Sequence, residues 1–333
     1  MRKLVLFSLI LAVVVIILGA YTRLTDAGLG CPDWPGCYGL LTVPLEDHHV
    51  EAANAAFPER PVEAAKAWNE MIHRYFAGAL GLCIFTIAAI AVKQRHSGRT
   101  VRLPLLLVAL VIFQAALGMW TVTLNLLPVV VMGHLLGGFT ILACLFLLHL
   151  KLRESKRKPR RINSITKFAL LGMAILLMQI GLGGWTSANY AALACTDFPV
   201  CEDGWASRLD FSGAFSVPYA ETYEYGAHGY GERMTMHIVH RAGAVITFLY
   251  LLWLGFRLYS REVAAPVKSA ALLLIGVLMI QVTLGVSNVV LSLPVIVAVA
   301  HNIVAACLLL VMVWITYQVS RYQGDPQQGG AHG

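Results

Sequence analysis

The apolar stretch at residues 73–89 reads HRYFAGALGLCIFTIAA, and its counterpart 167 residues later, at residues 240–256, reads HRAGAVITFLYLLWLGF. Each stretch begins with His-Arg. Each is also followed, 61 residues after its histidine, by a second histidine in an apolar segment, namely His134 and His301. Ionisable groups are costly inside hydrocarbon and usually mark functional sites. The repeat therefore predicts two related sites, each built around two histidines.

The composition predicts a membrane protein. Hydrophobic residues make up 58% of the 333 residues, charged residues make up 13%, and the mean hydropathy is +0.70. A soluble domain could not bury that much apolar surface. Backbone groups find no water partner in lipid, so the spanning segments must be helices. Eight stretches are long enough to span, at roughly 4–22, 71–92, 103–123, 129–150, 166–188, 234–256, 267–288 and 294–317.

The charge distribution predicts which helix ends face the cytoplasm. With the N-terminus placed inside, the inner segments hold 18 of the 25 basic residues and the outer segments hold 15 of the 18 acidic residues. Basic residues concentrate in cytoplasmic loops, so we expect both termini inside and the cysteine-bearing loops outside. The net charge of +7 then requires no nucleic-acid partner. The first segment resembles a signal peptide, but we expect no cleavage because its end is repeated inside the chain.

A weaker repeat divides each half again. Alternate helices end in related motifs, which are Gly19-Ala-Tyr21-Thr22, Gly118-Met-Trp120-Thr121, Gly183-Gly-Trp185-Thr186 and Gly285-Val-Ser287-Asn288. The aromatic residues suit the membrane interface. The fold class predicted is an all-α integral membrane protein, with eight transmembrane helices in two pseudo-symmetric four-helix bundles. We place the halves at 1–150 and 166–318, a basic cytoplasmic linker at 151–165 and a flexible tail at 319–333.

The four repeated histidines suggest haem iron. His73, His134, His240 and His301 each fall within about the first two turns of a helix that descends from the outer face. Two imidazoles without a matching carboxylate or thiolate set suit a planar metal group with two open axial positions, as in haem. Zinc would require further protein ligands at the same depth. The glutamines of the matching stretches Gln114-Ala-Ala-Leu-Gly118 and Gln281-Val-Thr-Leu-Gly285 receive no role from the sequence.

The two halves differ at one position beside the histidines. Glu70 stands three residues before His73, whereas His237 stands three residues before His240. Residues three apart share a helix face, so each group points to the same site as its neighbour. Glu70 could move protons beside a haem edge or be an ordinary interfacial acid. His237 could be an alternative ligand or a donor to one.

Arg74 and Arg241 follow the first histidine of each half. A guanidinium can pair bidentately with a haem propionate, and a long basic side chain can equally serve as an interfacial anchor. The sequence leaves both roles open.

The cysteines form another repeat, Cys31-Pro-Asp-Trp-Pro-Gly-Cys37 against Cys195-Thr-Asp-Phe-Pro-Val-Cys201. Both lie in predicted outer loops, where an oxidising compartment permits disulfides, so we expect two local bridges, Cys31–Cys37 and Cys195–Cys201. The bridges could brace the loops, or one could exchange electrons or be maintained by a thiol–disulfide reductase.

Taken together, these motifs resemble the haem A synthase family over about residues 1–320. The resemblance rests on residues 19–37 (GAYTRLTDAGLGCPDWPGC), on residues 70–74 (EMIHR), on Gly133-His134, on residues 237–241 (HIVHR) and on residues 300–302 (AHN). The resemblance implies an eight-helix oxidoreductase of the bacterial inner (plasma) membrane. Members of the family oxidise the C8 methyl group of haem O to the formyl group of haem A for cytochrome c oxidase assembly.

The resemblance implies a role for each site residue. His240 and His301 would ligate a haem b cofactor, and electrons would leave through that site. His73 and His134 would bracket the substrate haem O, with Glu70 as the catalytic acid. Cys31 and Cys37 match a redox-active pair, and Cys195 and Cys201 match a structural one.

The resemblance also implies partners, which are haem O, haem O synthase, cytochrome oxidase subunit I or its assembly factors, and an electron acceptor that the sequence does not identify. The sequence leaves the oligomeric state open, and a homo-oligomer is one of the alternatives.

Two other functions compete with this one. An electron-transfer cytochrome b with two bis-histidine haems explains every repeated histidine but not the difference between Glu70 and His237. A repeat-built transporter would place its site at the midplane, whereas the ionisable residues here fall near the outer surface.

Overall fold

The computed structural model of the chain describes residues 1–95, 101–153, 164–198, 200–260 and 265–321. Within these ranges, eight helices are long and apolar enough to cross a membrane. They are α1 (Arg2–Leu24), α3 (Ala64–Lys93), α4 (Arg102–Thr123), α5 (Pro128–Arg153), α6 (Ser164–Ala188), α8 (Tyr230–Ser260), α9 (Ala265–Val290) and α10 (Val295–Val319). The described residues form no β-strand. The prediction of an all-helical, multi-pass membrane protein is confirmed.

Two helices are longer than the apolar windows that predicted them. Helix α3 begins at Ala64 rather than near residue 71, and α8 runs from Tyr230 to Ser260 rather than from 234 to 256. Both helices extend beyond their apolar windows. The backbone hydrogen bonds of a helix already formed continue through the polar residues that lie outside the hydrocarbon. Parts of the predicted linker and tail, 154–163 and 322–333, lie outside the described residues.

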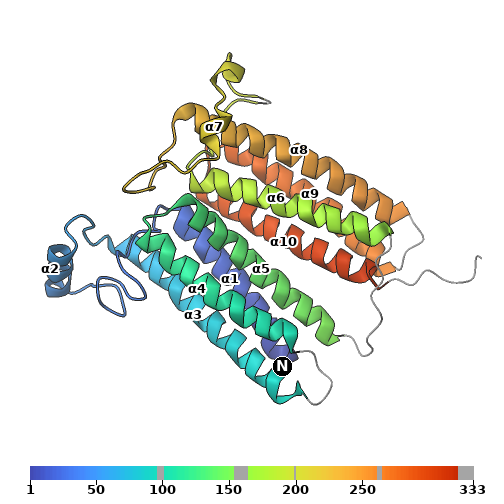
Figure 1. Cartoon of the computed structure of the whole chain (residues 1–333), viewed down its shortest axis with the longest axis horizontal. Helices are drawn as coiled ribbons and strands as arrows, with labels where there is room; N and C mark the ends of the chain where they lie inside the picture. The colour runs from blue at the N-terminus through green and yellow to red at the C-terminus, as the bar shows by residue number, and fades with distance from the viewer. Residues whose placement is uncertain (96–100, 154–163, 199, 261–264, 322–333) are drawn as a thin grey trace, which may run out of the picture.

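The eight helices pack as two groups of four (Figure 1). Helices α1, α3, α4 and α5 form one group, and α6, α8, α9 and α10 form the other; α1 and α5 of the first group contact α6 and α10 of the second. One apolar core runs through all eight helices. This arrangement is consistent with the two predicted four-helix bundles.

The four repeated motifs end their helices in the same way. In each, the carbonyl of the last motif residue accepts a hydrogen bond from the backbone N–H five residues further on. The residue directly before that donor has a positive φ. This arrangement is the Schellman cap. The donor–acceptor pairs are Ala27–Thr22 (2.9 Å), Leu126–Thr121 (2.8 Å), Ala191–Thr186 (2.9 Å) and Leu293–Asn288 (2.7 Å). The left-handed residues are Asp26, Asn125, Tyr190 and Ser292. Part of the sequence repeat is therefore a repeated helix stop.

The long connecting segments gather at one end of the bundle, called here the loop end. They carry α2 (Asp47–Ala56), the 3₁₀ turn η2 (Trp205–Arg208) and α7 (Phe211–Ala214) (Figure 1).

The two halves meet at the loop end through polar contacts. Arg23 donates to the carbonyl of Ser187 at 2.7 Å, and its guanidinium lies 3.9 Å from the centre of the Tyr190 ring. The backbone N–H of Tyr223 donates to the carbonyl of Asn125 at 3.0 Å. These contacts fix the two sets of loops relative to each other.

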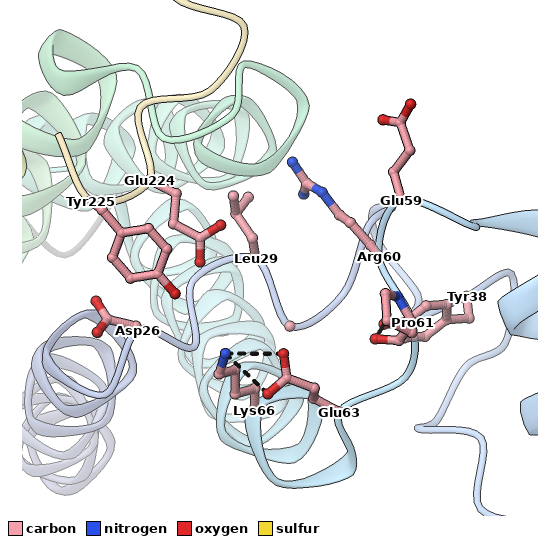
Figure 2. Close-up of a pocket in the computed structure, with 11 residues that line it drawn as sticks. Asp26, Leu29, Tyr38, Glu59, Arg60, Pro61, Glu63, Lys66, Glu224 and Tyr225 are labelled. Atoms are coloured by element: carbon pink, nitrogen blue, oxygen red, sulfur yellow. Dashed lines mark hydrogen bonds and ion pairs between the residues drawn. The ribbon is translucent and has the colours of Figure 1, made fainter. Parts of the chain in front are cut away.

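A small pocket of about 150 Å³ opens between the loops of the two halves. Figure 2 shows Lys66 of α3 paired with Glu63, with Glu224 and Tyr225 of the second half across the pocket. Its lining mixes acids and bases and contains none of the four repeated histidines.

Candidate functional site

Each of the four repeated histidines packs its imidazole against a glycine of a neighbouring helix. A Cβ atom built on the glycine would lie closer to Cε1 of the ring than ordinary van der Waals contact allows. The distances are 2.8 Å for Gly19 and His73, 3.1 Å for Gly118 and His134, 3.0 Å for Gly183 and His240, and 3.1 Å for Gly285 and His301. These glycines are the first residues of the four repeated motifs. Each motif therefore ends its own helix and also leaves space for a histidine of the neighbouring helix.

In the first half, the two imidazoles face each other. The ring centroids of His73 and His134 are 6.4 Å apart, and the ring planes cross at 76°. Two metal–nitrogen bonds of about 2 Å each would hold ring centroids roughly 6 Å apart. Nδ1 of His73, of His134 and of His301 is buried and finds no hydrogen-bond partner among the described residues. A pair of imidazoles with buried, unused nitrogens fits haem iron.

Glu70 lies one helical turn before His73 on α3 and is only 5% exposed. Its Oε2 accepts a hydrogen bond from the backbone N–H of Cys31 at 3.0 Å, and its Oε1 forms an ion pair with Arg74. The carboxylate is thus held on two sides, by its own helix and by the loop that carries the first cysteine pair.

Both predicted disulfides are present, Cys31–Cys37 with an S–S distance of 1.97 Å and Cys195–Cys201 with 2.09 Å. We call the segments from Cys31 to Cys37 and from Cys195 to Cys201 the first and second cysteine loops. The first cysteine loop lies directly on α3, since a Cβ on Gly30 would be 2.5 Å from the carbonyl carbon of Lys66. Only glycine allows this approach, which brings the Cys31 N–H to Glu70.

The two arginines hold the two cysteine loops in parallel ways. Arg74 Nη1 donates to the carbonyls of Asp33 at 2.9 Å and of Pro35 at 3.3 Å, and also to that of Gly36. Arg241 donates to the carbonyls of Asp197 and Cys195, both at 2.7 Å. Each arginine therefore ties the helix that carries the histidine to its neighbouring loop. Their pairing with propionates stays a prediction.

His237 occupies the position in the second half that Glu70 occupies in the first. Its side chain is 4% exposed, and within the described ranges its Nδ1 has no hydrogen-bond partner. The halves thus share histidine pairs, arginine clamps and disulfides, and they differ in having an acid or an imidazole beside the first histidine.

Tyr38 follows the first cysteine loop directly, and its hydroxyl donates to the carbonyl of Pro61 at 3.2 Å. Burial, together with the nearby carboxylates of Glu63 and Glu70, raises the pKa of this phenol above its ordinary value. It therefore remains a neutral donor near pH 7 and braces the loop.

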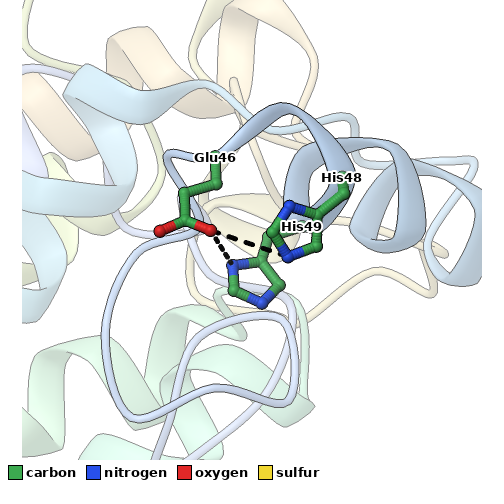
Figure 3. Close-up of side chains that lie close together, drawn as sticks. All are labelled: Glu46, His48 and His49. Carbon is green, nitrogen blue, oxygen red and sulfur yellow. Dashed lines mark ion pairs between the residues drawn. The ribbon is translucent and has the colours of Figure 1, made fainter.

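A second group of ligand-type residues lies elsewhere. Figure 3 shows Glu46 with His48 and His49 at the start of α2, where one carboxylate oxygen lies 3.6 Å and 3.8 Å from the two rings. All three side chains are exposed. They form a solvated surface cluster that does not include any of the four repeated histidines.

The structure is that of a multi-pass membrane protein in which the imidazoles of His73 and His134 face each other and a buried acid, Glu70, lies one turn before His73. The family model of COX15-CtaA, described as cytochrome oxidase assembly protein, matches residues 2–313. The chain belongs to this family.

Several curated relatives carry one name. A protein of Shewanella oneidensis named heme A synthase is 49% identical over 319 residues, covering 93% of this chain and 94% of that protein. Proteins with the same name from Rhizorhabdus wittichii and Rickettsia prowazekii are each 26% identical over 326 residues. They cover 92% of this chain and 90% and 94% of their own lengths.

Sequence reasoning missed two features of the site. Gly30 is needed for the loop to reach Glu70, and its signal was the Gly-Leu-Gly run before Cys31. The glutamines that precede the motif glycines by four residues touch the histidines, and their signal was the matched spacing of Gln114 and Gln281.

The arginine clamps generate a paired prediction. We expect Arg74→Met to make Cys31–Cys37 more rapidly reducible by a water-soluble phosphine, because the loop loses the three bonds that hold it on α3. The Cys195–Cys201 pair should keep its wild-type rate in the same molecule. Alkylation and peptide mass analysis measure both rates. Arg241→Met is the matched control and should reverse the pattern; equal rates in all three proteins would contradict the clamp.

Proposed function

We propose that the chain is a haem A synthase, which oxidises the C8 methyl group of haem O to the formyl group of haem A for cytochrome c oxidase assembly. The name of the Shewanella relative, at 49% identity over nearly the whole length, supports this activity. The observation that carries it is the buried carboxylate of Glu70, one turn from His73 and present in the first half only. A buried acid beside the site can accept protons that leave an oxidised carbon, whereas an electron-storage site has no such proton to accept.

In this proposal the two halves have different occupants. His73 and His134 hold the substrate haem O, and His240 and His301 hold a haem b cofactor. The 6.4 Å separation of the ring centroids supports a haem between His73 and His134. The division into a haem O half and a haem b half rests on the family resemblance and on the position of Glu70 in the first half. When bound, haem b supplies one-electron redox chemistry.

Glu70 acts on the reacting methyl group. We infer oxidation through an alcohol and a hydrated aldehyde. In each of two steps water supplies one oxygen atom to the carbon, two electrons leave to a separate acceptor and two protons are released; the hydrate then loses water to give the formyl group. Glu70 accepts such a proton or stabilises positive charge that develops on the carbon. A carboxylate fixed in place before the reaction does this at low reorganisation cost, and the Cys31 N–H and Arg74 fix Glu70 on both sides.

The proposal includes an orientation. The excess of basic residues on one side places both termini in the cytoplasm of a bacterial cell and the loop end in the periplasm. Haem O would come from haem O synthase, haem A would pass to subunit I of cytochrome oxidase or its assembly factors, and a separate acceptor would take the electrons. A periplasmic thiol–disulfide reductase could then reach the cysteine loops.

The proposal predicts the effect of neutralising Glu70. Glu70→Gln keeps the size and one hydrogen-bond acceptor but removes the proton acceptor, so conversion of haem O to haem A should fall by about 100-fold or more, as for loss of a general base. The measurement is chromatography of the haems extracted from membranes that also contain haem O synthase. Glu63→Gln, a neighbouring exposed acid, is the control and should keep wild-type conversion. Unchanged turnover of Glu70→Gln at normal haem content would contradict the assigned role.

The assignment of the second half predicts a difference between two glycines of α6. Gly183→Val places carbon atoms against Cε1 of His240, so the haem b content of the purified protein should fall several-fold. Gly181→Val is the matched control, because a Cβ on Gly181 meets no atom within 4 Å in the described part of the chain. A haemochrome assay measures haem b per protein. Equal haem b content in the two variants would rule out His240 as a ligand held against Gly183.

A further inference from the structure

A cluster of metal-ligand side chains lies outside the histidine sites, at the start of α2. Glu46 is the residue before this helix, and His48 and His49 lie in its first turn. One ring nitrogen of each histidine lies near the same carboxylate oxygen, Oε2 of Glu46 (Figure 3). The separations are 3.6 Å from Nε2 of His48 and 3.8 Å from Nδ1 of His49. Three ligand-type atoms thus converge on one point.

The separations are those of ligands that share an ion rather than those of direct hydrogen bonds. An N–H···O hydrogen bond spans about 2.7–3.2 Å, so both contacts are too long. Two ligands of a tetrahedral ion, with metal–ligand bonds of about 2.1 Å, lie roughly 3.4 Å apart. All three ligand atoms lie within 4.8 Å of one another. Rotation of the side chains therefore suffices to bring the set to ligand spacing.

The backbone at the start of α2 fixes the three residues relative to one another. The carbonyl of Glu46 accepts hydrogen bonds from the backbone N–H groups of His49 and Val50, both at 2.9 Å. The Glu46 side chain makes no capping hydrogen bond, so its carboxylate is available to an ion. The side chains of Glu46, His48 and His49 are 71%, 70% and 43% exposed. They can therefore rotate, and an ion can reach them from solvent.

The types of ligand select the type of metal. Imidazole nitrogens suit Zn²⁺, Cu²⁺ and Ni²⁺, whereas Ca²⁺ and Mg²⁺ prefer oxygen ligands. Two histidines and one glutamate leave a further position to water, as in open zinc sites with the same ligand set. The helix dipole disfavours a cation at a helix N-terminus, and the carboxylates of Glu46 and Asp47 oppose this effect.

We propose that Glu46, His48 and His49 bind one divalent late first-row metal ion, of the Zn²⁺ or Cu²⁺ type, at the loop end. The ion links the residue before α2 to the first turn of that helix. Ala53 of the same helix packs in one apolar cluster with the first disulfide, so the ion stabilises a helix that lies against the first cysteine loop. The site contains none of the repeated histidines, and the proposal does not rest on the proposed function.

The first test measures metal binding by the full-length protein, purified without a polyhistidine tag. Calorimetric titration with Zn²⁺ should show one ion per chain that depends on the three ligands. Even outer-shell partners contribute about tenfold or more to metal affinity, so His48→Asn, His49→Asn and Glu46→Gln should each weaken binding at least that much. The helical circular dichroism of each metal-free variant should equal that of the wild type, which shows that the variant is folded.

Asp47→Asn is the matched control, because it removes the same charge as Glu46→Gln from the next residue but removes no ligand atom. It should weaken Zn²⁺ binding by less than about threefold, since exposed charges contribute little. The EPR spectrum of bound Cu²⁺ gives an independent count of ligands. It should show coupling to two imidazole nitrogens in the wild type and to one in His48→Asn or His49→Asn.

Hydrogen exchange locates the ion on the chain. Zn²⁺ should slow the exchange of the backbone amides of α2 in the wild type, because a short helix is marginal by itself and a bound ion stabilises the folded form. The same addition should leave the exchange of α2 unchanged in the double variant that carries His48→Asn and His49→Asn.

Three outcomes would overturn the proposal. Equal Zn²⁺ affinity of the wild type and the double variant would leave an adventitious ion only. Unchanged exchange of α2 at saturating Zn²⁺ would place the ion elsewhere. A loss of affinity in Asp47→Asn as large as that in Glu46→Gln would show that charge alone attracts the ion. None of these results bears on the conversion of haem O, so this proposal and the proposed function can fail separately.

Discussion

The contact between an imidazole and the bare backbone of a glycine is the constraint on which the rest of the structure depends. It occurs four times, always near the loop end of the bundle and between neighbouring helices. Small residues let helices approach closely in membranes, and here the space gained is filled by a polar ring. The same four-residue motif ends the helix with a Schellman cap. Each motif thus fixes helix length, helix spacing and the depth of a histidine at once.

On this repeated frame, the two halves differ where their chemistry must differ. The first half places a buried acid beside its histidine and ties that acid to a disulfide loop through the Cys31 N–H. The second half has His237 at that position and gives its histidine rings amide partners instead. A buried acid beside the first histidine suits a site that transforms its occupant. The cysteine loop shapes the acid's surroundings, so its arginine clamp acts on the site without touching the histidines.

Much of this could be predicted from the sequence because repeats and hydropathy report directly on helices in lipid. The eight spans, both disulfides and the two sets of histidines follow from spacing and composition. The starts of α3 and α8 could not, since polar residues continue a helix beyond the apolar window without any change in hydropathy to mark it. Nor could the bonds of Arg74 and Arg241, because loop carbonyls leave no trace in side-chain identity. The glutamines were visible as a repeat, but only the structure shows that they contact the histidines.

The most direct test of the central claim is the haem composition of the purified protein made together with a haem O source. The account predicts haem b together with haem O, its hydroxylated form or haem A, because one histidine pair retains a cofactor and the other holds a substrate in transit. Haem b in both sites, with no haem O or haem A, would show an electron-transfer cytochrome and would contradict the account.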